Sequence, residues 1–74
     1  MEASLKIITE DGPEWVEADR IFALVEGGRP HTCYVHLRAI GKHSHPRMLV
    51  VEEDLPVVDR RLQRCLNREQ GVST

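Results

Sequence analysis

Residues 31–40 show the most regular alternation of apolar and polar positions in the chain. Cys33, Val35, Leu37 and Ala39 would lie on one side of an extended segment, with polar residues between them on the other side. A period of two is typical of a half-buried β-strand. We therefore predict that this segment forms the central strand of a sheet.

Shorter apolar runs predict further strands on both sides of this segment. They are residues 5–9, 14–17, 21–26 and 47–52. Residues 10–13 (EDGP) and 27–30 (GGRP) combine glycine with proline, as tight turns do. Residues 41–46 are polar and rich in turn formers, so we expect them to form the exposed tip of a hairpin.

The last apolar pattern has helical spacing. Leu55, Val58, Leu62 and Leu66 form one stripe, with Cys65 beside it. The acidic run Glu52-Glu53-Asp54 comes directly before it, where negative charge favours a helix N-terminus. We predict that the Asp54 side chain caps the helix while its acidic neighbours are solvated. The helix is expected to stop near Gly71.

These elements predict a small α+β domain. The expected architecture is a mainly antiparallel sheet of three to five strands, with one C-terminal helix packed on one face. A single domain spans residues 1–74, with an ordered core over about 4–69 and a frayed tail over 70–74. The predicted buried residues are Leu5, Ile7, Ile21, Ala23, Val35, Leu37, Leu49, Val51, Leu55, Val58, Leu62 and Leu66.

Composition places the chain among small globular proteins. It has 74 residues, of which 41% are hydrophobic and 30% charged, and its net charge is −2. So short a chain buries a small core, which favours a homodimer. No apolar run is long enough to cross a membrane and no secretory signal is recognisable, so we expect a cytoplasmic protein without a membrane partner. Cys33 and Cys65 are expected to be buried thiols, with a disulfide between them as the alternative.

Several histidines lie close to a cysteine in the sequence. On a strand, His31 and Cys33 would share a face about 7 Å apart, and the loop residues His43 and His45 could form a two-ligand clamp. Their spacing does not match a zinc finger or ribbon. A metal-binding protein that uses these four residues is kept as an alternative hypothesis. The favoured prediction is a protein without a cofactor.

No arrangement of residues favours catalysis. Cys33 is the one nucleophile with histidines nearby, and burial of a thiol raises its pKa rather than activating it. Gly27-Gly28 precedes a predicted strand, whereas a phosphate-binding loop precedes a helix. We therefore expect a protein that is not an enzyme.

The distribution of basic residues suggests nucleic-acid binding as a second alternative function. Residues 1–30 carry three basic and seven acidic side chains, and residues 31–74 carry seven basic and five acidic. A nucleic-acid-binding regulator would use the helix arginines together with basic residues of the hairpin tip. These candidates are Arg60, Arg61, Arg64, Arg68, Lys42 and Arg47.

The favoured hypothesis is an accessory or regulatory module that acts through protein contacts at an exposed sheet edge or by self-association. Its expected contact patch consists of Tyr34, His36 and Arg38 on the open face of their strand, with Trp15 added if that side chain is exposed. The identity of the partner protein does not follow from the sequence.

The order of elements resembles that of the FlbD/SwrD family of small flagellar-operon proteins. The residues that carry the resemblance are Asp11-Gly12, the segment 14–21 (EWVEADRI) and the segment 48–53 (MLVVEE) that leads into the helix. The resemblance covers most of residues 5–66 and implies a cytoplasmic accessory protein of motility without catalytic residues. The same order is also similar to the first half of a LytTR-type DNA-binding domain.

Overall fold

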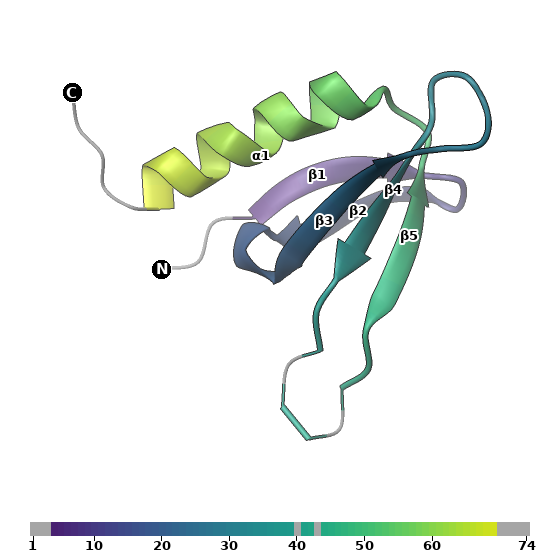
Figure 1. The fold of residues 1–74 in the computed structure, drawn as a ribbon. Helices are drawn as coiled ribbons and strands as arrows, with labels where there is room; N and C mark the ends of the chain where they lie inside the picture. The colour runs from purple at the N-terminus through teal and green to yellow at the C-terminus, as the bar shows by residue number, and fades with distance from the viewer. Residues whose placement is uncertain (1–3, 40, 43, 70–74) are drawn as a thin grey trace.

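The computed structural model describes residues 4–39, 41–42 and 44–69, without the side chains of residues 68 and 69. These residues form a five-stranded sheet, a short 3-10 helix and one α-helix (Figure 1). The elements in chain order are β1 (Ser4–Thr9), β2 (Gly12–Glu17), η1 (Ala18–Arg20), β3 (Ile21–Glu26), β4 (Cys33–Leu37), β5 (Arg47–Val51) and α1 (Leu55–Glu69). The α+β class is confirmed.

The strand order is β2-β1-β5-β4-β3, and all neighbouring strands are antiparallel. The prediction that residues 31–40 supply the central strand is wrong, because β5 occupies the middle position. β4 lies between its two hairpin partners, β3 and β5. The N-terminal hairpin joins the sheet on the outer side of β5, through β1.

The sheet is divided at the contact between β1 and β5. These strands pair only at Thr9 and Val51, whereas β1 and β2 pair along their full length. The two edge strands, β2 and β3, are joined by the three residues of η1, so the sheet curls strongly. The helix lies across the open part of this curl and contacts β1, η1 and β3 (Figure 1).

The core lies between the curled sheet and α1. Its buried members come from β1, β2, η1, β3, β4, β5 and α1, and they include the predicted Leu5, Ile7, Val35, Leu37 and Val58. Val16 and Ala18 are also buried but were not in the predicted set. Leu55 and Leu66 are partly buried at its margin.

The prediction for Ala23 is wrong. The pairing of β3 with β4 shifts between Ile21 and Ala23, which is a β-bulge. An extra residue reverses the side on which all later side chains lie. Ala23 is therefore opposite His36 on the outer face and half-buried, while Leu24 is opposite the buried Val35 and packs against the core.

The helix begins directly after Asp54, as predicted. The Asp54 backbone carbonyl accepts hydrogen bonds from the N–H groups of Val57 and Val58, each 3.1 Å long. The Asp54 carboxylate, predicted to cap the helix, lies 2.9 Å from Nδ1 of His31. Our predictions for Gly71 and the tail fall outside the described residues. Within the described part, no helix is long and apolar enough to cross a bilayer.

The β3–β4 connection is tight at Gly27. Its N–H donates to the Thr32 carbonyl at 3.1 Å. A Cβ atom on Gly27 would lie 2.1 Å from Oγ1 of Thr32, which is far inside van der Waals contact. The close approach of the two chains at this position therefore requires glycine.

Candidate functional site

The outer face of β3, β4 and β5 carries an apolar surface. Tyr34 pairs with Val25 on one side, and His36 pairs with Met48 on the other. The bulge turns Phe22 onto the His36 ring, with ring centroids 5.8 Å apart and planes tilted by 53°. Phe22, Met48 and Val25 are 57%, 50% and 45% exposed. Clusters of exposed apolar side chains of this kind mark contact surfaces more often than isolated ones do.

A groove runs beside the free edge of β3. It lies between β3 and the N-terminal half of α1 and has a volume of about 350 Å³. Its apolar lining comes from both elements and consists of Ile21, Phe22, Ala23, Leu24, Leu55 and Leu62. We call this feature the β3 groove. Since Phe22 belongs to both surfaces, the groove is continuous with the apolar outer face.

The charge of the β3 groove is negative. Asp59 is the one charged residue in its lining, and its carboxylate accepts only a long hydrogen bond of 3.5 Å from Gln63. A second hollow of about 650 Å³ shares Leu55 with the groove, and its charged and titratable lining residues are of both kinds, Glu26 and Asp54 together with Arg29 and His31. A ligand of the β3 groove itself would therefore meet apolar side chains and the Asp59 carboxylate.

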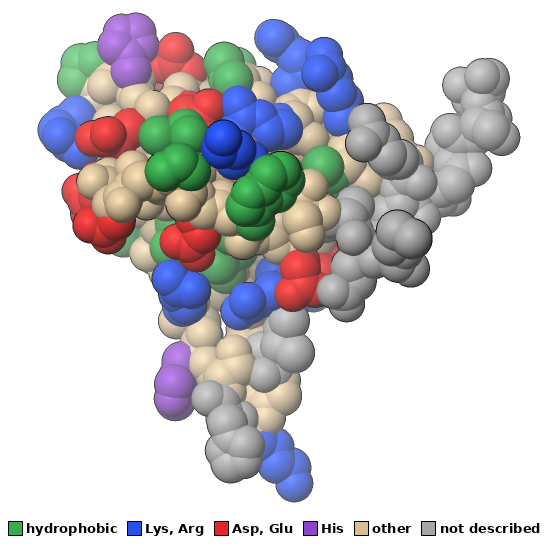
Figure 2. Space-filling model, turned by 180° about the vertical axis from the view of Figure 1, so that it is seen from behind, with side chains coloured by type: hydrophobic (Ala, Val, Ile, Leu, Met, Phe, Trp, Pro, Cys, Tyr) green, Lys and Arg blue, Asp and Glu red, His purple; other side chains and the backbone are tan. Residues whose placement is uncertain are grey.

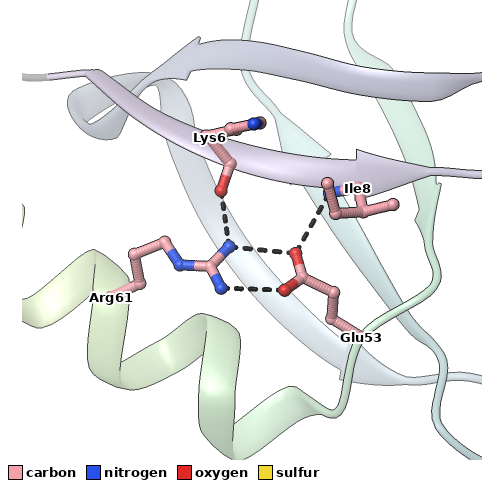
Figure 3. A network of polar contacts seen from close by, with 4 residues as sticks. All are labelled: Lys6, Ile8, Glu53 and Arg61. Carbon is pink, nitrogen blue, oxygen red and sulfur yellow. Dashed lines mark hydrogen bonds and ion pairs between the residues drawn. The ribbon is translucent and has the colours of Figure 1, made fainter.

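A polar network holds α1 against β1 beside the division in the sheet (Figure 3). Arg61 of α1 forms a two-point ion pair with Glu53, with N–O distances of 2.9 and 2.8 Å. The same guanidinium donates to the Lys6 carbonyl, and the Glu53 carboxylate accepts the N–H of Ile8 at 3.0 Å. The ion pair thus satisfies the backbone groups of β1 that β5 leaves unpaired.

The network alters the acid–base properties of Glu53. Hydrogen bonds from the Arg61 guanidinium lower the pKa of this carboxyl, and the Ile8 N–H adds to the effect against the opposing influence of burial. The Glu53 side chain is only 16% exposed, so the prediction that it is a solvated neighbour of the cap is wrong. It is a structural contact between helix and sheet.

The structure brings together two members of the predicted contact patch. Tyr34 and His36 lie side by side on the outer face, half-buried among the apolar residues described above, and the Tyr34 hydroxyl accepts the Gly28 N–H at 3.3 Å. Arg38 is exposed beyond the end of β4. Trp15 is 67% exposed but lies on β2, in a hollow shared with α1.

The predicted metal ligands do not converge in the described residues. His31 is an exposed loop residue with φ 60°, paired with Asp54. Cys33 is completely buried on the inner face of β4, where burial raises the pKa of its thiol and the charges of Glu53 and Asp54 raise it further. His45 is exposed in the β4–β5 connection, and His43 lies outside the described residues. No group of three potential ligands is placed to hold a metal among the described side chains.

The candidate nucleic-acid contacts fall into two separate groups. Lys42 and Arg47 belong to the β4–β5 hairpin, whose tip projects away from α1 (Figure 1). Arg60 and Arg64 are exposed on α1, whereas Arg61 is committed to Glu53. The side chain of Arg68 lies outside the described residues. The helix and the hairpin therefore do not form the single basic surface that the alternative hypothesis combined.

Sequence reasoning missed three residues of the outer face. Met48 could have been predicted to lie on the outer face, because side chains alternate along a strand and its neighbour Leu49 was predicted to be buried. Val25 and Phe22 could not, since the bulge that exposes them leaves no clear pattern in the residues of β3. The apolar outer face is therefore largely a result of tertiary structure.

Comparisons of the chain with protein-family models, with curated proteins and with solved structures found no match. The resemblances to the FlbD/SwrD and LytTR families stay sequence-based predictions. Any functional conclusion must therefore rest on the surfaces described above.

Proposed function

We propose that the protein is a non-enzymatic accessory module that binds an extended segment of a partner polypeptide along β3. The observation that supports this most is the coincidence of a free strand edge with the β3 groove directly beside it. Both cysteines are free thiols, which agrees with a reducing compartment, and we include a cytoplasmic setting in the proposal.

The backbone of β3 provides the first part of the recognition. Gly27 donates to Thr32, so this pair is a hydrogen-bonded pair of the β3–β4 ladder. Hydrogen-bonded and non-hydrogen-bonded pairs alternate between antiparallel strands. Leu24 and Glu26 therefore direct their N–H and C=O groups toward the free edge, where an added strand can pair with them.

Side chains provide the second part. Successive residues of an added strand point to opposite faces. One row would enter the β3 groove against Leu24 and Leu62, and the other would extend the outer face beside Phe22 and Val25. Asp59 in the groove favours a lysine or arginine in the first row. The expected ligand is thus a predominantly apolar strand with one basic residue.

The test uses an end-capped synthetic peptide of alternating isoleucine and threonine with one central lysine. The control peptide has the same sequence with methylated backbone nitrogens, which cannot donate to a strand edge. Binding is measured by amide chemical shifts in NMR spectra. We expect shifts in β3 and the first half of α1 with the first peptide and none with the second. Equal binding of both peptides would refute strand addition.

Charge reversal tests the orientation of the ligand in the groove. Asp59→Lys should weaken binding of the lysine peptide and strengthen binding of a glutamate peptide, by roughly tenfold each. Asp19→Lys, which makes the same charge change on η1, should leave the preference unchanged. An identical response of the two variants would show that only net charge matters.

Self-association is the competing occupant of this edge. Light scattering after size-exclusion chromatography gives the mass of the protein in solution. A monomer that binds the peptide supports the proposal. A dimer that is abolished by Phe22→Asp and does not bind the peptide would overturn it, since a second copy would then occupy the edge.

A further inference from the structure

Two neighbouring hollows lie on the surface of α1, and one of them extends to the N-terminal hairpin. One, of about 160 Å³, is lined by Val57, Arg60, Arg61 and Arg64. The other, of about 280 Å³, includes Lys6, Trp15 and Cys65 together with the same Arg61 and Arg64. The two hollows share the side chains of Arg61 and Arg64, and we call them together the arginine–tryptophan groove.

The cations of this groove are available to a ligand. In the described part of the chain, the side chains of Arg60, Arg64 and Lys6 make no ion pair with a carboxylate. Arg61 is held by Glu53, which keeps its position between the two hollows. Arg60 and Arg64 are four residues apart on a helix and therefore lie on the same face.

The aromatic part of the groove is Trp15, the single tryptophan of the chain, with 67% of its surface exposed. A tryptophan of a folded domain is usually mostly buried. Here the indole lines the hollow that also contains Lys6, Arg61 and Arg64. An exposed indole beside arginines offers a stacking surface next to a positive charge.

The surroundings of the groove restrict the width of its ligand. In Figure 2, several Lys and Arg side chains lie at the upper right and centre beside hydrophobic ones, while others are spread with Asp and Glu side chains over the rest of the same face. The hairpin itself contains Glu10, Asp11 and Glu14. A nucleic-acid duplex would extend over these carboxylates, while a single strand can follow the groove alone.

We infer that the arginine–tryptophan groove binds single-stranded nucleic acid, with phosphates on Arg60, Arg64 and Lys6 and a base stacked on Trp15. Basic side chains for the phosphates and an aromatic side chain for a base are the two elements from which sequence-tolerant single-strand sites are built. The groove is separate from the β3 groove, so this inference does not depend on the proposed peptide binding.

Tryptophan fluorescence reports the interaction directly, because Trp15 is the only indole. Addition of a thymidine dodecamer at low salt should quench the emission. Three phosphate contacts predict that the logarithm of the binding constant falls with the logarithm of salt concentration with a slope of about −2. Unchanged emission at saturating oligonucleotide would refute the role of Trp15.

Matched variants test the phosphate contacts by anisotropy of a fluorescein-labelled dodecamer. The double variant Arg60→Gln/Arg64→Gln should weaken binding by roughly tenfold or more and make the salt slope shallower. The control Arg29→Gln/Arg38→Gln removes the same charge elsewhere and should bind like the unmodified protein. Equal losses in both would overturn the site.

Two competitors decide the chemical class of the ligand. Polyglutamate of equal charge presents anions without bases, and a duplex dodecamer presents stacked bases that cannot reach Trp15. Both should displace the labelled strand much less effectively than an unlabelled one. If polyglutamate competes as well as the single strand, the groove is a site for acidic polypeptides and the inference is wrong.

Discussion

The ion pair between Arg61 and Glu53 provides the sharpest test of how the helix is attached to the sheet. Substitution of Arg61 by methionine keeps the length and the apolar stem of the side chain. It removes both hydrogen bonds to Glu53 and the bond to the Lys6 carbonyl. The Glu53 carboxylate then stays close to β1 without its counter-ion.

The expected cost follows from the exposure of the two side chains, which are 34% and 16% exposed. Removing one partner of a fully buried pair costs about 3–5 kcal/mol, and a solvated pair contributes about 0–1 kcal/mol. An intermediate pair with two extra backbone contacts should cost about 2 kcal/mol. For a domain of this size, that loss lowers the melting temperature by roughly 10 °C.

The effect should depend on pH. Arg61 lowers the pKa of Glu53 below its unfolded value of about 4.3. Its stabilising effect is therefore complete above that pH and is lost as the pH falls toward the lower pKa of the folded state. The stability difference between the unmodified protein and Arg61→Met should be large at neutral pH and should shrink in acid.

Urea unfolding followed by circular dichroism measures both effects. Arg60→Met makes the same substitution at an exposed neighbour and should change the unfolding free energy by less than about 0.5 kcal/mol. If Arg61→Met and Arg60→Met unfold alike at neutral pH, the network does not attach α1 to β1. A difference that persists unchanged in acid would show that the Glu53 charge is not involved.

Further predictions concern packing and thiol reactivity. Val58→Ala removes a completely buried side chain and should cost about 2 kcal/mol, whereas Val57→Ala, at a position 42% exposed, should be nearly neutral in the same urea assay. Gly27→Ala presses a methyl group into the facing chain and should destabilise by about 1–3 kcal/mol in thermal unfolding. In the folded protein Cys33 should resist iodoacetamide because burial raises the pKa of its thiol, while Cys65 should be alkylated first, as mass spectrometry can determine.

The types of the elements could be predicted from the sequence because they depend on local periodicity. Alternation in residues 33–37 and helical spacing from Leu55 to Leu66 indicate which side chains are buried, whatever their partners are. Glycine and proline in residues 10–13 and 27–30 mark the turns between strands. The α+β class and most of the core follow from these local patterns.

The functional surfaces were less predictable because they combine residues from distant elements. From the sequence, Trp15 was assigned to a protein-contact patch and Arg64 to a nucleic-acid surface. In the structure, both side chains line one hollow. Lys42 and Arg47 were grouped with the helix arginines, although the hairpin that carries them projects away from α1 (Figure 1). No local pattern distinguishes these outcomes.

The sequence by itself determined the strands, the turns and the apolar stripe of α1, since steric preferences and burial act on neighbouring residues. Only the tertiary structure decided that β5 is central and that a bulge exposes Phe22. It also decided that Glu53 and Arg61 form hydrogen bonds with backbone groups of β1. The physical reason is that strand order and register depend on the packing of distant segments. The β3 groove and the arginine–tryptophan groove both result from that packing.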